Sequence, residues 1–275
     1  MYFAMDDIGF ENLEKIQPLD SESDRWKFIY DIAKAYGFDG IHITPSFYDR
    51  IKLDLNNIPD YLNDFKLTLH FGGLYRFISS IDINTFDKEL EARFEIALKH
   101  NMHDISIHPP YTHEMPLPQK ELCLDSLHNS IDKWLRVFSK SNISLSLESH
   151  CSGKYFLFDG LREYASFAAM HPELGVLIDI SHNYYDRYSE EDIINILGHA
   201  NIKGLHISDA IQGAEFKEGT HLAVGDGTMD FTKFINHFSG TPNLFAVLEI
   251  KAGNEGISKS LSSLKQLLAE SRSSS

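Results

Sequence analysis

Short apolar runs recur along the chain, and each ends at or near a histidine or a carboxylate. The clearest run, Val176-Leu177-Ile178-Asp179, is apolar and β-branched, as expected for a strand buried on both faces. A carboxylate at the end of such a strand is costly to bury unless it is paired or binds a metal. Six runs share this design, and they reach His70, His108, Glu148, Asp179, His206 and Glu249. Together they indicate one shared site at the mouth of a barrel.

Segments in which apolar residues follow helical spacing lie between these runs. Strands are predicted at residues 2–5, 38–44, 65–70, 104–108, 143–148, 176–179, 202–207 and 244–250. Helices are predicted from a start at 20–23 to a stop at Gly37, and at 85–100, 118–139, 159–170, 188–197, 230–238 and 256–270. Residues 51–64 form a connection whose structure the pattern does not determine.

Alternation of strands and helices predicts βαβ units, and about eight of them in 275 residues predict a closed (β/α)8 TIM barrel. The chain has no linker rich in proline, glycine or serine, so residues 1–270 are expected to form a single domain, followed by a disordered tail at 271–275. A doubly wound sheet is the competing architecture. The barrel is preferred because the polar residues lie at many strand ends, whereas an open sheet gathers them at one switch point.

The composition of the chain limits the kinds of partner and the cellular location that we expect. Lys and Arg total 25 and Asp and Glu total 40, which gives a net charge of −15. This charge argues against nucleic acid as the default partner, because it repels the phosphate backbone. A local basic patch could still exist on a protein whose total charge is acidic. The cysteines Cys123 and Cys151 form no CxxC pair or disulfide framework. The N-terminus lacks a basic segment followed by an apolar one, and no apolar run is long enough to span a bilayer. We therefore expect a cytoplasmic protein without membrane association.

Glu148, Asp179, His206 and Glu249 form the first set of candidate residues. Carboxylates combined with an imidazole suit a divalent ion such as Mn²⁺, Mg²⁺, Co²⁺ or Zn²⁺. These residues are far apart in sequence, but each falls at the end of a different predicted strand. The alternative is that each is an ordinary polar residue at a strand end, which is a weaker explanation for four residues in register than for one.

His70, His108, His182 and His221 form the second set. They are candidates for ligands of a second metal or for groups that bind sugar hydroxyls, and the plainer alternative is a histidine hydrogen-bonded within a loop. His42 lies two positions before the end of its predicted strand and is expected to be a buried structural residue.

These residues carry a resemblance to a known family. Glu148, the pattern Asp179-x-x-His182, His206 with Ser208-Asp209, the loop His221-x-x-x-Gly225-x-Gly227, and Glu249 resemble the xylose isomerase-like barrel superfamily. That group contains sugar and sugar phosphate isomerases and epimerases, inosose dehydratases and AP endonucleases of the endonuclease IV type. The resemblance covers nearly the whole chain, and members of the group often associate through their outer helices, which allows a homo-oligomer.

For an isomerase or epimerase, the resemblance implies a metal held by Glu148, Asp179, His206 and Glu249. The ion would bind two adjacent oxygens of a ketose, and the two glutamates would transfer the proton α to the carbonyl through an enediolate. His182 would hold a substrate hydroxyl. The expected partner is a small sugar or sugar phosphate. Ketose 3-epimerases have a second glutamate where Lys154 stands and an arginine where Gln212 stands, so the resemblance implies the reaction class rather than that particular reaction.

Two other functions remain open. The endonuclease IV ligand set maps onto all eight residues of the two sets, but Gly219 stands where that family has an aspartate, and the arginine beside it is also missing. Cleavage of a phosphodiester by several zinc ions depends on such ligands, so this hydrolase function ranks second. The third is a barrel that binds a sugar or a metal without turnover.

Overall fold

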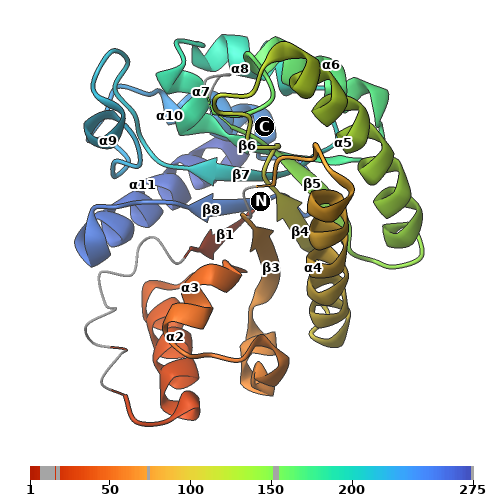
Figure 1. Ribbon diagram of the computed structural model, residues 1–275. Coiled ribbons are helices and arrows are strands. Elements are labelled where there is room, and N and C mark those ends of the chain that lie inside the picture. Colours follow the sequence, from red (N-terminus) through yellow and green to blue (C-terminus); the bar gives the residue numbers. More distant parts are fainter. Residues whose placement is uncertain (7–15, 17–18, 73–74, 151–154, 274–275) are drawn as a thin grey trace.

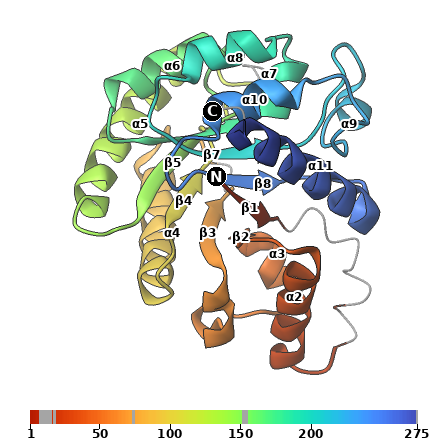
Figure 2. The ribbon, with the colours of Figure 1, turned by 180° about the vertical axis from the view of Figure 1, so that it is seen from behind.

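The computed structural model describes residues 1–6, 16, 19–72, 75–150 and 155–273. Eight parallel strands close into a barrel in sequence order, with helices around the outside, as Figure 1 and the reverse view in Figure 2 show. The predicted (β/α)8 barrel is therefore confirmed. The strands are β1 (Tyr2–Met5), β2 (Gly40–Ile43), β3 (Lys66–Phe71), β4 (Asp104–Ile107), β5 (Ser144–Ser149), β6 (Gly175–Asp179), β7 (Ile202–Ile207) and β8 (Phe245–Leu248).

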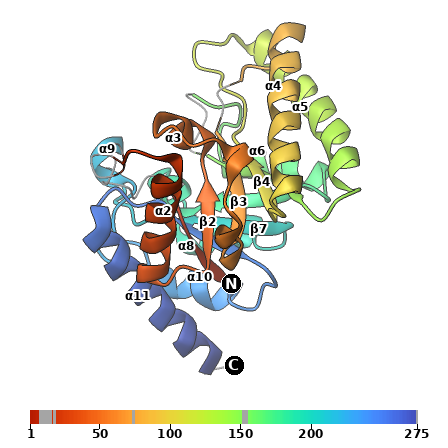
Figure 3. The same ribbon diagram turned by 90° about the horizontal axis from the view of Figure 1, so that it is seen from below.

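Helices follow most of the strands and cover the barrel, and Figure 3 shows α4 and α5 side by side along one flank. They are α2 (Glu22–Tyr36), α3 (Pro45–Arg50), α4 (Ser80–Lys99), α5 (Leu117–Phe138), α6 (Leu161–Met170), α7 (Ile180–Tyr185), α8 (Glu190–Leu197), α9 (Phe216–Gly219), α10 (Phe231–Phe238) and α11 (Gly253–Ser273). Two short 3₁₀ helices, η1 (Leu55–Asn57) and η2 (Asp60–Asp64), occupy the connection between α3 and β3. Among the described residues, no helix is both long and apolar enough to cross a membrane.

Local chemistry explains where the helices begin and end. The hydroxyl of Ser21 accepts the backbone N–H of Asp24 at 3.1 Å and caps α2, and Gly37 ends that helix with a φ of 75°, a conformation that suits glycine. Helix α4 begins at Ser80, five residues before the predicted start, because Ser79 caps it in the same way. Helix α11 runs to Ser273, so residues 271–273 continue the helix rather than beginning the predicted tail; residues 274–275 lie outside the described residues.

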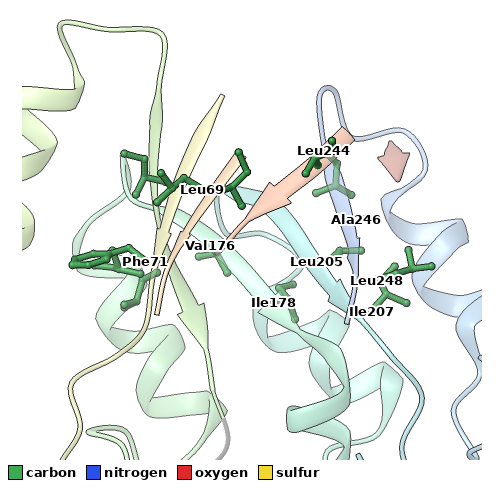
Figure 4. Packing of buried hydrophobic residues seen from close by; sticks show 14 of the residues in the cluster. Leu69, Phe71, Val176, Ile178, Leu205, Ile207, Leu244, Ala246 and Leu248 are labelled. Atoms are coloured by element: carbon green, nitrogen blue, oxygen red, sulfur yellow. The ribbon is translucent and has the colours of Figure 1, made fainter. Parts of the chain in front are cut away.

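Alternation along each strand separates two environments. Val176 and Ile178 pack outward against the helices, together with residues such as Leu69 and Leu205, in the large core that Figure 4 shows. A small apolar cluster lies apart from that core, on inward positions of the barrel; it consists of Tyr2, Ala4, Leu177, Phe245 and Val247. The same alternation that turns Leu177 inward also turns Asp179 toward the mouth of the barrel.

Close packing inside the barrel gives a stability prediction. A Cβ on Gly204 would lie 2.2 Å from the ring of Phe245 and 2.8 Å from Leu177. We expect Gly204→Ala to reduce the free energy of unfolding by about 1–3 kcal/mol, measured by urea denaturation. The matched control is Gly240→Ala, where a Cβ has no described atom within 4 Å. Equal stability of the two variants would contradict tight packing around Gly204.

Candidate metal centre

The candidate metal ligands come from the carboxyl ends of four adjacent strands. Glu148 lies near the end of β5, Asp179 is the last residue of β6, and Glu249 directly follows β8. Asp179 and His206 are partners in the ladder between β6 and β7. All four side chains are nearly inaccessible to solvent, with Glu249 the most exposed at 5%.

Three overlapping groups of side chains gather here. They are His70, His108 and Glu148; Glu148, Asp179 and His182; and Asp179, His206 and Glu249. In each group the ligand atoms lie within 4.8 Å of one another. Nδ1 of His206 lies 3.3 Å from a carboxylate oxygen of Glu148 and 3.3 Å from one of Glu249. The structure thus brings together seven of the eight candidate residues, all but His221, in these groups around the mouth of the barrel.

The turn after β6 uses one carboxylate oxygen of Asp179 as a helix cap and leaves the other available to bind a ligand. Oδ1 of Asp179 caps α7 by accepting the backbone N–H of His182 at 2.8 Å and the hydroxyl of Ser181 at 3.0 Å. Oδ2 is buried and makes no hydrogen bond with any described residue, although it lies 3.1 Å from Nδ1 of His182. The pattern Asp-x-x-His therefore begins a helix and directs the remaining oxygen toward the site.

His221 reaches the site because its loop is held by Asp209. The carboxylate of Asp209 accepts the backbone N–H groups of Ala210, Gly225 and Met229, at 2.8, 2.9 and 3.1 Å. His221 takes a φ of 57°, and its Nε2 lies 3.1 Å from Nε2 of His182. The glycine-containing loop noted in the sequence thus positions one imidazole against another.

Burial and the two glutamates set the charge of the imidazoles. Burial opposes the charged form of His206, but Glu249 and Glu148 outweigh it and raise the pKa of His206 to about 10. The same pairing holds the pKa of Glu148 well below its usual range despite burial, through His206 and His108. Burial lowers the pKa of both His182 and His221 to about 4, so both are neutral at pH 7, and one donates to the other between their Nε2 atoms.

The buried donor set fits a divalent cation. Nδ1 of His206 and Oδ2 of Asp179 are buried and have no hydrogen-bond partner among the described residues. Such atoms are costly to bury unless something else binds them. One imidazole nitrogen with several carboxylate oxygens is a common set for Mn²⁺, Co²⁺ or Zn²⁺. His206, Asp179, Glu249 and Glu148 are the residues that would hold the ion.

Two histidines outside the predicted sets also belong to this region. His42 is fully buried, as expected, but its Nε2 lies 3.3 Å from Nε2 of His206, and its Nδ1 lies 2.7 Å from the hydroxyl oxygen of Thr68. The His150 ring lies 4.5 Å from the ring of His182. The sequence could have indicated His150, because it lies two residues after Glu148 and alternate residues of a strand share a face.

Not every residue considered from the sequence is placed at the centre. Lys154, which stands where ketose 3-epimerases have a glutamate, lies outside the described residues. Gln212 is exposed, in the loop between β7 and α9. Gly219 is buried, and a Cβ there would lie 2.7 Å from Ala214 and 3.0 Å from the carbonyl oxygen of Ile211. The backbone is too close at Gly219 to accept an aspartate without a shift of this loop.

Comparisons with known proteins identify the family of the chain and proteins that share its fold. The sequence model of the family described as xylose isomerase-like TIM barrel matches residues 30–267. A D-tagatose 3-epimerase-like protein superposes with a TM-score of 0.73 at 17% identity, covering 100% of this chain and 99% of that one. An IOLI protein with a bound zinc atom superposes with a TM-score of 0.70 at 14% identity, covering 99% of this chain and 96% of that one. An AP endonuclease of family 2 from Brucella melitensis superposes with a TM-score of 0.71 at 13% identity, covering 96% of this chain and 98% of that one. No curated protein matches the chain.

His42 gives a prediction about metal affinity. If His206 binds through Nδ1, its proton sits on Nε2 and is donated to Nε2 of His42, which in turn donates from Nδ1 to Thr68. We expect His42→Phe, which keeps the ring size, to weaken metal binding about 10–100-fold in a competition titration with a chelating dye. Thr68→Val should weaken it in the same direction. The control His128→Phe on α5 should leave it unchanged, and an unchanged affinity in His42→Phe would contradict this role.

Proposed function

The chain belongs to the xylose isomerase-like TIM barrel family, and on that basis we propose that it is a divalent-metal-dependent isomerase or epimerase of a sugar or sugar phosphate. The observation that supports this most is the convergence of Glu148 and Glu249 on Nδ1 of His206, at 3.3 Å each. Two carboxylates then flank one ligand position, which is the arrangement needed to remove a proton from one carbon and return it.

The two glutamates have the proton-transfer role. The low pKa of Glu148 keeps its carboxylate ionised at neutral pH, as a proton acceptor and as a metal ligand. Glu249 approaches the same nitrogen of His206 and completes the pair. The chemistry supplied by a bound divalent ion is polarisation of a substrate carbonyl, which acidifies the adjacent C–H bond. Proton removal there gives an enediolate, and return of the proton to the neighbouring carbon or to the opposite face gives the isomer or the epimer.

Neutral histidines around this pair suit a polyhydroxylated substrate. His182 and His221 have pKa values lowered to about 4 by burial, so each offers one N–H donor and one acceptor nitrogen at pH 7. Phe216 packs on the ring of His182 at 5.5 Å and contributes an apolar wall. This combination of hydrogen-bonding groups with an aromatic wall is what a small carbohydrate requires. The epimerase-like neighbour supports a substrate of this class.

A phosphodiesterase of the endonuclease IV type is the second candidate, and one contact favours it. Oε2 of Glu148 lies 3.0 Å from Nε2 of both His70 and His108, so Glu148 is placed to bridge two metal ions. Several clustered metal charges are what phosphodiester cleavage needs. The buried glycine at 219 and the net charge of −15 weigh against a DNA substrate. A barrel that binds a sugar or a metal without turnover is the non-catalytic alternative.

Solvent deuterium incorporation tests the proton transfer. Ketoses and ketose phosphates incubated in deuterated water with the metal-loaded protein should gain deuterium at carbon, detected by NMR. Glu249→Gln should slow this exchange by at least ~10²-fold, because the carboxamide neither accepts nor returns the proton. His237→Gln, on the outer helix α10, is the control and should exchange normally. Metal content is measured for both, and full exchange by a metal-loaded Glu249→Gln protein would refute the assignment.

Metal removal separates the candidates. Chelation should abolish exchange, and adding back Mn²⁺, Co²⁺ or Zn²⁺ should restore it. The isomerase needs one tightly bound ion per chain, whereas the phosphodiesterase needs at least two. Elemental analysis after dialysis gives the stoichiometry, and cleavage of an oligonucleotide with an abasic site gives the competing activity. Two or more ions with strand cleavage and no deuterium exchange would move the hydrolase to first place.

A further inference from the structure

A cavity of about 400 Å³ lies at the end of the barrel opposite the candidate metal centre. Six of the residues that line it are the first residues of their strands, namely Tyr2, Lys66, Asp104, Ser144, Ile202 and Phe245. The metal centre lies at the carboxyl ends of the barrel strands, so the two sites are at opposite ends of the barrel, and the cluster residues Leu177 and Val247 lie between them. A cavity of this volume is in the range of small-molecule sites.

Asp104 is the buried polar group of this cavity. Its side chain is 2% exposed, and Oδ1 accepts the hydroxyl of Ser146 at 2.6 Å. Oδ2 is buried and makes no hydrogen bond with any residue of the described ranges. Burial raises the pKa of Asp104 to about 7, opposed by Ser146 and Lys203, so the carboxyl group is half protonated near neutral pH. A protonated carboxyl donates a hydrogen bond to an anion, as an ionised one cannot.

The other charged groups lining the cavity are cationic. Lys66 extends over the ring of Tyr2, with Nζ 4.4 Å from the ring centroid. The stem of Lys203 runs past Gly175, where a Cβ would meet its Cγ at 2.7 Å and the hydroxyl of Ser146 at 2.3 Å. Ser146 binds Asp104, so Gly175 leaves room for Lys203 beside the buried acid. Neither lysine forms an ion pair within 4 Å among the described residues.

We propose that this cavity binds a small doubly charged oxyanion, such as inorganic phosphate or the phosphate group of a monoester, between Lys66, Lys203 and Asp104. The two ammonium groups supply the charge, and the carboxyl group of Asp104 supplies a buried hydrogen-bond donor to one anion oxygen. His103 and Asn243 line the same cavity, and each can turn an N–H donor toward a bound anion. A ligand rich in acceptor oxygens is therefore the one that this lining satisfies.

Protonation of Asp104 gives the site a distinctive pH dependence. The ionised carboxylate repels an anion and the protonated form binds it, so affinity falls as pH rises through about 7. The other titratable groups lining the cavity are Tyr2 and His103, apart from the two lysines. Burial raises the pKa of Tyr2, and burial with Lys66 lowers that of His103, so Asp104 is the group lining the cavity that is expected to titrate near pH 7.

Sulfate is the probe, because its charge is constant between pH 6 and pH 8. Calorimetric titration of the full-length protein should give an affinity about tenfold weaker at pH 8 than at pH 6, from the protonated fraction of Asp104. Asp104→Asn keeps a donor and should bind equally at both pH values, whereas His103→Gln should retain the wild-type dependence. Lys203→Met and Lys66→Met, which keep the aliphatic stems, should each weaken binding about tenfold at pH 6.

The control is Lys217→Met, because Lys217 lies in α9, after the carboxyl end of β7. The proposal is overturned if sulfate binding is lost in Lys217→Met but normal in Lys203→Met and Lys66→Met, because the anion then binds at the metal centre. It is also overturned if the affinity of the wild-type protein does not change with pH. The two lysine variants keep the test decisive if Asp104→Asn fails to fold. Glycerol phosphate binding more tightly than sulfate would identify a monoester as the ligand, and equal binding would identify the free anion; both results support the site.

Discussion

The structure at the carboxyl end of this barrel depends on one constraint, which is the burial of polar atoms that have no hydrogen-bond partner. Nδ1 of His206 and Oδ2 of Asp179 are enclosed by protein, and no described residue makes a hydrogen bond to either. Leaving such atoms unsatisfied costs free energy, and an ionised carboxylate costs most. A cation bound between His206, Asp179 and Glu249, whose ligand atoms lie within 4.8 Å of one another, would satisfy both atoms. Without an ion, Glu249 and Glu148 stabilise a proton on His206, which accounts for its raised pKa.

The barrel meets this constraint through strand alternation. Outward residues such as Ile178 pack against the helices and supply the hydrophobic stabilisation, while inward residues are free to be polar. In β6, Leu177 belongs to the interior apolar cluster, and Asp179 comes one inward position later, where the strand ends. The barrel therefore holds a group of buried polar and charged side chains at one end and the cavity around Asp104 at the other. Since fold alone does not define a reaction, function rests on the side chains at these ends.

Much of this arrangement was predictable from the sequence, because the strands are apolar runs and their ends are marked by polar residues. The bounds of β1 and β7 match the predicted ranges, and the barrel closure follows from the number of strand–helix repeats. Helix starts were less predictable: α4 begins at Ser80 because of a single capping serine, and α11 extends to Ser273 because Ser271 is buried and contacts Ser239. The convergence of distant strand ends was expected from the topology. The contact of His42 with His206 was not, because it depends on two side chains that meet across the barrel interior from strands that are not neighbours, β2 and β7.

The most direct test of the central claim is the location of the metal. Crystals of the protein grown with Mn²⁺ should give an anomalous difference peak about 2.0–2.3 Å from Nδ1 of His206 and from carboxylate oxygens of Asp179 and Glu249. A peak at that position, with His206 bound through Nδ1, is the result that this account predicts. An empty position at saturating Mn²⁺, or an ion bound elsewhere while His206 and Asp179 keep their present contacts, would contradict it.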